Sequence, residues 1–207
     1  MRPLRLIPPA LHQDVPTRSL EAAMQVKPGD TVAIDELHAI KGATVVLPDP
    51  ENLVHLQFRR FAGCPICNVH LQAVIKRHDE IVAAGIREVV MFHSTPEELA
   101  AYVDDMPFDV IADPDRVLYR RFGVETSMRS VADPRSMAPV LRGMMDRSLA
   151  GKRRLSAGMH RANGGHLGLP ADILIDASGI VVDAKYGKHA GDQWSVDELL
   201  EHTKARR

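Results

Sequence analysis

The sequence has few cysteines, almost no net charge and no long apolar run. Among 207 residues there are two cysteines, and 26 Lys and Arg against 27 Asp and Glu leave a formal net charge of −1. This balance argues against a nucleic-acid binder that depends on overall charge, so we expect no nucleic-acid partner. No apolar run approaches the roughly 20 residues of a membrane helix, so we expect no membrane partner. Two cysteines do not build a disulfide scaffold, and a chain of this length can fold on its core instead.

The N-terminal residues argue against a secretory signal. The segment MRPLRLIPPALHQD carries charges and prolines where a signal peptide has an unbroken apolar stretch. We therefore expect a cytoplasmic chain. The length suits one domain over 1–207, with an N-terminal extension over 1–25 that begins with a proline-rich lead-in and ends in a short helix over 17–25.

Residues 128–161 differ in composition from the rest of the chain. They hold five of the nine Met, and seven Arg and one Lys against two Asp give this stretch a local charge of +6. The stretch is too short to have a core of its own, so we expect an insertion, helical over 135–150, rather than a second domain. It is either an amphipathic helix that covers the core, or a lid or dimer surface.

The apolar pattern predicts alternating strands and helices. After short strands at 43–47 and 53–58, apolar residues recur at spacings of three and four from Cys64 to a helix end near Ala84-Gly85. The order continues with a strand at 86–93, a capped helix from 94–96, a strand at 110–112, a helix over 113–122, the insertion, a hairpin of 171–176 with 180–186, and a capped helix over 195–204. This order predicts an α/β fold: a central mixed sheet of about five strands flanked by helices, with a helical insertion before the final antiparallel hairpin.

The two cysteines form the motif Cys64-Pro-Ile-Cys67 at the turn from a strand into a helix. In a reducing compartment a lone CxxC is typical of catalytic, redox-sensing or metal-binding sites. The helix N-terminus offers free N–H groups and the positive end of the dipole, which stabilise a thiolate. We expect Cys64 to be the more exposed thiol with the lower pKa and Cys67 the more buried one. Arg59 and Arg60 add positive potential, unless they lie at a solvated strand end.

The chain resembles the thioredoxin-like superfamily, and within it the peroxiredoxin-like branch of the alkyl hydroperoxide reductase/thiol-specific antioxidant type. The resemblance is carried by VKPGDTV at 26–32, LQFRRFAGCPICNVHL at 56–71 and ADILIDASGIVVDAKYG at 171–187. It implies a thioredoxin-like fold and a thiol-disulfide oxidoreductase, with peroxide reduction as an extension. It further implies that Pro170 follows a cis bond from Leu169 and shapes the substrate site, to which we add Arg60 and Phe61.

Two versions of the chemistry remain open, and they assign opposite roles to the cysteines. In a dithiol mechanism Cys64 attacks a disulfide and Cys67 resolves it. Peroxiredoxins typically carry Pro-x-x-x-Thr-x-x-Cys, and this motif places the peroxide-attacking cysteine at Cys67. Cys64 then stands at the Thr position and Arg60 at the Pro position. The family's catalytic Arg has no match at 168–171. Both versions end in a Cys64–Cys67 disulfide, need an external thiol reductant and use no cofactor; a homodimer is compatible with either.

A different class of function is a redox switch or metal-binding module without catalysis. Cys64, Cys67 and His70 follow the spacing C-x2-C-x2-H, and His160 or His166 could supply a fourth ligand. Structural zinc sites usually have a second ligand pair, which the chain lacks, so we expect no resident metal.

Overall fold

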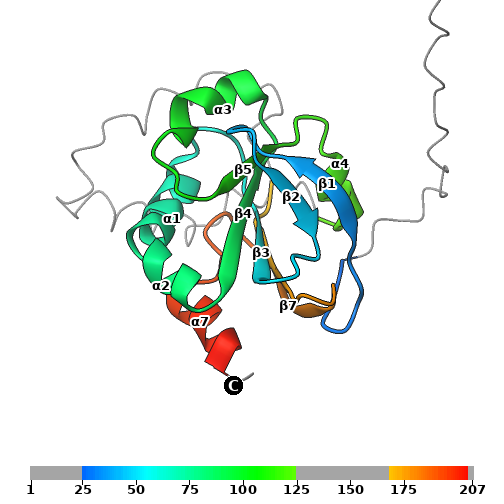
Figure 1. The fold of residues 1–207 in the computed structure, drawn as a ribbon. Coiled ribbons are helices and arrows are strands. Elements are labelled where there is room, and N and C mark those ends of the chain that lie inside the picture. The colour runs from blue at the N-terminus through cyan, green and yellow to red at the C-terminus, as the bar shows by residue number, and fades with distance from the viewer. Residues whose placement is uncertain (1–24, 125–167, 205–207) are drawn as a thin grey trace, which may run out of the picture.

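A computed structural model describes residues 25–124 and 168–204 (Figure 1). The helices expected over 17–25 and 135–150, and the insertion over 128–161, lie outside the described residues, apart from residue 25. None of the helices in the described part of the chain combines the length and the apolar character that crossing a membrane requires.

The centre of the structure is a five-stranded sheet in the order β5-β4-β3-β6-β7. Strands β3, β4 and β5 run parallel, whereas β6 is antiparallel to β3 and β7 is antiparallel to β6. This is the mixed sheet, with its final antiparallel hairpin, that the sequence predicts. The strands are β3 (Leu53–Phe58), β4 (Ile86–Phe92), β5 (Asp109–Ala112), β6 (Ala171–Ile175) and β7 (Val181–Tyr186).

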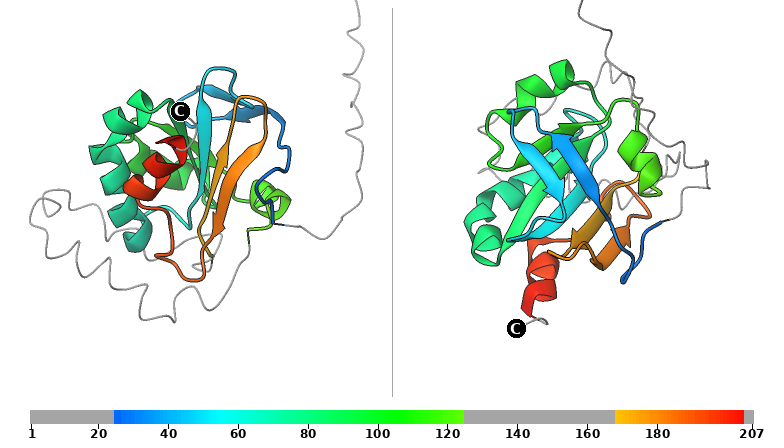
Figure 2. Two further views of the ribbon diagram at one scale, coloured as in Figure 1. Left: turned by 90° about the horizontal axis from the view of Figure 1, so that it is seen from below. Right: turned by 45° about the vertical axis from the view of Figure 1, so that its right-hand side comes forward.

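In the described part of the chain, helices α1, α2, α3 and α7 lie on one face of this sheet (Figure 2, left). Two of them begin at reciprocal caps: the Thr95 hydroxyl accepts from the Glu98 N–H while the Glu98 carboxylate accepts from the Thr95 N–H, and Ser195 and Glu198 do the same. Both caps fall where the sequence places helix starts. The helices are α1 (Pro65–Lys76), α2 (His78–Ala83), α3 (Pro96–Val103) and α7 (Val196–Lys204).

The opposite face is covered by helix α4 (Val117–Arg121) and a two-stranded ribbon of β1 (Ile34–His38) and β2 (Thr44–Leu47) (Figure 2). The sequence analysis missed β1. Ile34 and Leu37 are both buried although they lie three residues apart, because the register shifts between them, and this shift removes the alternation that marks a strand.

Two helices differ in extent from expectation. The single helix expected from Cys64 to Ala84 is divided at Arg77, whose backbone N–H is shared between the carbonyls of Ala73 and Val74 at 3.2 Å each. Helix α4 begins only at Val117, because the Asp113 carboxylate accepts the N–H groups of Val117, Leu118 and Tyr119 from outside the helix.

Alternation along the strands divides the interior into two halves. Val54, Leu56 and Phe58 of β3 join the apolar cluster that contains β1, β2 and α4 residues. The residues between them, His55 and Gln57, are also buried but polar. Apolar residues of β4, such as Val90 and Phe92, pack with the helices of the other face. The face of β3 that turns toward α1 is therefore polar at its centre.

The N-terminal described segment is held at the hairpin turn between β6 and β7. Val32 N–H donates to the Gly179 carbonyl at 2.7 Å, and Gly179 has φ +84°. A Cβ at Gly179 would lie 2.8 Å from the Val32 carbonyl oxygen, closer than real Cβ contacts. This turn therefore needs glycine both for its backbone conformation and for space.

We expect Gly179→Ala to lower the free energy of unfolding by more than Gly42→Ala does. Gly42 has the same φ of +84° but nothing within 4 Å of its Cβ position, so alanine there costs only the backbone strain, about 1 kcal/mol. The contact with Val32 adds about 1 kcal/mol or more at Gly179. Urea unfolding of both variants measures the difference, and equal losses would contradict it.

Candidate dithiol site

The two cysteines lie at the start of α1, directly after β3, as the sequence predicts. Cys64 is the N-cap residue of α1 and Pro65 is its first helical residue. The Cys64 sulfur accepts from the Cys67 N–H at 3.5 Å and from the Cys67 thiol at 2.9 Å. Both cysteines are free thiols. The helix start thus directs a backbone donor and a thiol donor at the same sulfur atom.

The electrostatics of the pair favour a thiolate at Cys64. The hydrogen bond from the Cys67 thiol lowers the pKa of Cys64 to about 7, against the opposing effect of burial and with help from the positive charge of Arg60. The Arg60 guanidinium lies 3.7 Å from the Cys64 sulfur and packs over the Phe61 ring. Burial, followed by the contact with Cys64, raises the pKa of the Cys67 thiol well above its ordinary value.

The expected difference in exposure between the two cysteines is wrong. Both have 0% exposure, and they form a small apolar cluster with Phe61, Ile66 and Ala190. Ala190 belongs to the loop between β7 and α7, more than 120 positions along the chain from the motif. Sequence reasoning missed Ala190 because a lone alanine in a loop carries no signal of its partner.

The two arginines before the motif differ in role, and neither lies at a solvated strand end. Arg60 faces the dithiol, as expected. Arg59 is 0% exposed and instead donates to Asp172 at 2.6 Å and to the Gln57 side-chain oxygen at 2.5 Å. A buried guanidinium cannot lose its proton, so it requires a buried carboxylate as counter-ion.

The cis bond expected between Leu169 and Pro170 is wrong. In residues 25–124 and 168–204 the cis peptide bond is Leu47–Pro48, and Leu169–Pro170 is trans, the isomer that an X–Pro bond prefers by about 0.5–1 kcal/mol. The segment does approach the dithiol: a Cβ at Gly168 would lie 3.8 Å from the Arg60 side chain. Gly187 permits this course, since a Cβ there would lie 2.7 Å from the Pro170 ring.

The metal-binding interpretation finds no support in the geometry. His70 Nε2 lies 3.1 Å from Arg59 Nη2, so this atom faces a cation. In the described ranges no group of three or more His, Cys, Asp or Glu side chains is placed to hold a metal ion. His160 and His166 lie outside those ranges.

A buried ionic network lies beneath α1, and sequence reasoning missed it. His55 contacts Glu88 through Nδ1 and Asp172 through Nε2 at 3.1 Å, and Gln57 donates to Glu88. With Arg59 these side chains are at most 2% exposed. Burial would lower the pKa of His55, but Glu88 and Asp172 raise it to about 9. The available signal was a set of polar residues at strand positions between apolar ones.

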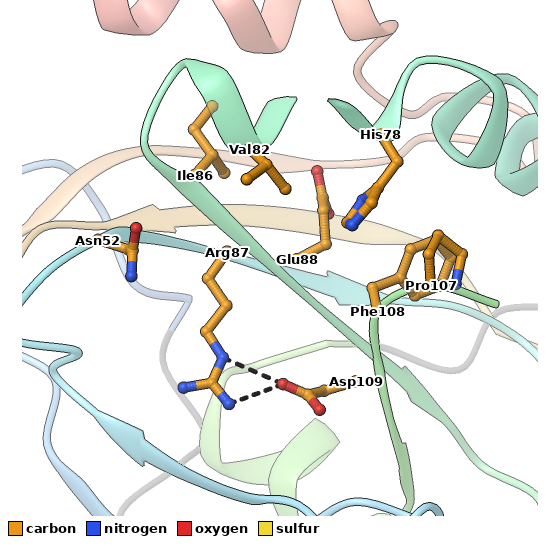
Figure 3. A pocket seen from close by; sticks show the side chains of 9 residues that line it. All are labelled: Asn52, His78, Val82, Ile86, Arg87, Glu88, Pro107, Phe108 and Asp109. Atoms are coloured by element: carbon orange, nitrogen blue, oxygen red, sulfur yellow. Dashed lines mark hydrogen bonds and ion pairs between the residues drawn. The ribbon is translucent and has the colours of Figure 1, made fainter. Parts of the chain in front are cut away.

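A cavity among the described residues lies away from the dithiol. It has a volume of about 230 Å³, and Figure 3 shows its lining side chains, with Glu88 of the ionic network among them. The cavity is at the amino ends of the parallel strands β4 and β5, whereas Cys64 follows the carboxyl end of β3. The two sites therefore occupy opposite ends of the sheet. The lining residues are Asn52, His78, Val82, Ile86, Arg87, Glu88, Pro107, Phe108 and Asp109.

Comparison with known proteins extends these observations. The sequence model of a family described as AhpC/TSA antioxidant enzyme matches residues 70–189, which is 120 of 207 residues. The match begins three residues after Cys67, so it includes neither cysteine. No curated protein matches this chain in sequence.

Solved structures share the fold at low identity. A peroxidoxin, BcpB, from Mycobacterium tuberculosis has a TM-score of 0.63 at 17% identity and covers 88% of this chain and 99% of its own. A reduced 2-Cys peroxiredoxin from Plasmodium vivax has a TM-score of 0.58 at 14% identity, covering 87% and 82%. A putative thiol:disulfide interchange protein, DsbE, from Chlorobium tepidum has a TM-score of 0.54 at 18% identity, covering 88% and 98%. The fold is therefore thioredoxin-like.

We expect Cys67→Ala to raise the pKa of Cys64 from about 7 toward 8.5, the ordinary value of a thiol. The substitution removes the thiol that donates to the Cys64 sulfur. Cys67→Ser keeps an O–H donor, so its rise is smaller. Thiolate absorbance at 240 nm reports Cys64 alone in both variants. The same Cys64 pKa in Ala and Ser variants would contradict the role given to this hydrogen bond.

We expect the ionic network to make stability depend on pH. The folded pKa of His55, about 9, exceeds the unfolded value of 6.5, so its contribution is complete below pH 6.5 and is lost as the pH rises through 9. The loss is about 3 kcal/mol. Urea unfolding of a Cys64→Ser/Cys67→Ser chain avoids thiol titration. Adding His55→Gln abolishes the fall in the free energy of unfolding between pH 6.5 and 9. An unchanged dependence of stability on pH in that range would refute the assignment.

Proposed function

We propose that this chain, which belongs to the AhpC/TSA antioxidant enzyme family, is a thiol-disulfide oxidoreductase that uses Cys64 and Cys67 as its redox pair. Membership in the family makes the chain an oxidoreductase, of the peroxidase or the thiol-disulfide kind. The choice between these kinds depends on the two cysteines, which the family match does not cover.

The asymmetry of the two thiols carries the proposal. The pKa of Cys64 is lowered to about 7 and that of Cys67 is raised. A thiolate with a pKa near the ambient pH is both populated and nucleophilic, which is the optimum for attack on a disulfide. A neighbouring protonated thiol is suited to the later, resolving step. This assigns attack to Cys64 and resolution to Cys67.

The reaction then proceeds in two exchanges. The Cys64 thiolate attacks one sulfur of a substrate disulfide, forms a mixed disulfide and releases the other substrate sulfur as a thiolate. Cys67 gives up its proton and attacks the Cys64 sulfur, which releases the second substrate thiolate and leaves a Cys64–Cys67 disulfide. The substrate has gained two electrons and the enzyme has lost two, so an external thiol reductant must reduce the enzyme disulfide.

The surroundings suit this chemistry. Arg60 lies beside the attacking sulfur and holds a positive charge that stabilises the thiolate. Phe61 packs against Arg60 and the cysteines. Leu169 and Pro170 directly follow Gly168, which lies at the Arg60 side chain. The candidates for substrate contact therefore remain Arg60, Phe61, Leu169 and Pro170. A cytoplasmic setting and a homodimer stay predictions.

Peroxide reduction is the second candidate, and family membership favours it. One thiolate attacks the peroxide oxygen, which yields a sulfenic acid and releases an alcohol or water. The other thiol condenses with the sulfenic acid, which expels water and forms the same disulfide. The peroxiredoxin motif assigns the attack to Cys67. The raised pKa of Cys67 opposes this assignment, because the thiol is protonated at neutral pH.

Single serine variants separate the two candidates. We expect Cys67→Ser to accumulate a mixed disulfide at Cys64 with a disulfide substrate, because the resolving thiol is gone, and Cys64→Ser to accumulate none. Intact-protein mass spectrometry detects the adduct. The Cys64→Ser/Cys67→Ser chain, which has no thiol, is the control. A sulfenic acid at Cys67 in Cys64→Ser after one equivalent of peroxide, with no adduct in Cys67→Ser, would establish the peroxidase reading instead.

A further inference from the structure

His70 extends the cysteine motif by one helical turn and has no part in the exchange reaction. It lies on α1 three residues after Cys67. Its Nε2 atom meets the Arg59 guanidinium at 3.1 Å. Burial and the charge of Arg59 lower the pKa of His70 to about 3, so the ring is neutral and its nitrogen can accept a hydrogen bond. His70 thus links the cysteine helix to the end of β3.

Arg59 is fixed at its backbone from two directions. Its N–H donates to the Met91 carbonyl of β4 at 2.8 Å. Its carbonyl and the Met91 carbonyl, the latter at 2.9 Å, share the single proton of the Tyr119 hydroxyl of α4. The residue after it, Arg60, is therefore held at a defined position relative to the sheet.

The side chain of Arg59 is fixed as firmly. The guanidinium donates to Asp172 of β6 at 2.6 Å and to Gln57 of β3 at 2.5 Å, and the same Nη2 atom reaches His70. Neither Arg59 nor Asp172 has any exposed side-chain surface. A buried guanidinium whose Nη2 atom meets three neighbouring side chains has little freedom to move, so it is a rigid support for the helix that rests on it.

We propose that Arg59 and His70 are positioning residues for the dithiol: the guanidinium, anchored on Asp172, holds α1 through His70 and so fixes the two sulfurs against Arg60. The proposal deepens the function proposed above and rests on it for its catalytic meaning. Arg59 thereby controls two groups at once. Its backbone fixes the position of Arg60, and its side chain fixes the position of α1, which carries the cysteines. The distance between Arg60 and the Cys64 sulfur then determines how strongly the positive charge stabilises the thiolate.

The charges around His70 agree with this role and oppose metal ligation. The groups that act on the imidazole are Arg59, Asp172, His55 and Lys185, and all of them except Asp172 are cations. Arg59 Nη2 lies 3.1 Å from His70 Nε2, so a divalent ion bound at Nε2 would bring a further positive charge against the guanidinium. The third residue of the C-x2-C-x2-H spacing is better explained as the contact point of the helix.

The test compares two substitutions at His70. His70→Gln keeps an acceptor oxygen that can bond to Arg59, whereas His70→Leu fills the space without an acceptor. In a Cys67→Ser background, so that Cys64 is the one thiol, we expect His70→Leu to raise the Cys64 pKa by about one unit, measured at 240 nm. His70→Gln restores the pKa to within a few tenths of the parent value. Arg59→Lys, whose shorter side chain cannot place its nitrogen at the Nη2 position, provides a second variant if His70→Leu does not fold.

The matched control is Asp109→Asn. It breaks an ion pair with Arg87, at 2.8 Å, that joins β4 to β5 at the opposite end of the sheet from the dithiol. Urea unfolding measures the stability of every variant. We expect the control to lower stability without moving the Cys64 pKa. A Cys64 pKa that follows stability in all variants, control included, would overturn the positioning role, as would equal pKa values in His70→Leu and His70→Gln.

Two further experimental outcomes distinguish this inference from the function on which it rests. The thiolate titration needs no substrate, so it is informative even if the native chain exchanges with no disulfide or peroxide. In that case the proposed function fails while a shift in His70→Leu still supports the positioning pair. Zinc bound stoichiometrically by the native chain and lost in His70→Leu and His70→Gln alike would overturn the inference and make His70 a ligand.

Discussion

The contact on which the rest of the structure depends is the ion pair between Arg59 and Asp172. Both side chains are removed from water, and the desolvation of two charges is recovered only when each is also hydrogen-bonded. His55 and Glu88 complete the balance, so the interior beneath α1 holds two cations and two anions. Loss of one member leaves an uncompensated buried charge, at a cost of about 3–5 kcal/mol.

This network gives one sheet two different faces. On β3 the alternation of side chains sends Val54, Leu56 and Phe58 into an apolar cluster and His55 and Gln57 into the ionic one. Both faces of β3 are buried, so its residues from Val54 to Phe58 are all buried. The polar residues among them therefore do not lie at the surface. The helix that carries the cysteines therefore rests partly on charged groups rather than wholly on hydrocarbon.

Local patterns predicted those features whose causes are local. The caps at Thr95 and Ser195 and the place of the cysteines at a helix start depend on residues a few positions apart. The mixed sheet was predicted from the order of strands and helices along the chain. The exposure of Cys64 was misjudged because Ala190 covers it from a distant loop. The burial of Arg59 was missed because its counter-ion, Asp172, also lies far away in the sequence.

The partner of Arg59, Asp172, is 113 positions away in the chain. Strand β6, which contains it, inserts between β3 and β7 after most of the other elements have been made. During synthesis from the N-terminus, a chain that ends before β6 already contains the complete CxxC motif, Arg60 and His70. It lacks the carboxylate that holds the Arg59 guanidinium beneath α1. With the positioning role proposed for Arg59, the two thiols reach their final place against Arg60 only once β6 has been made.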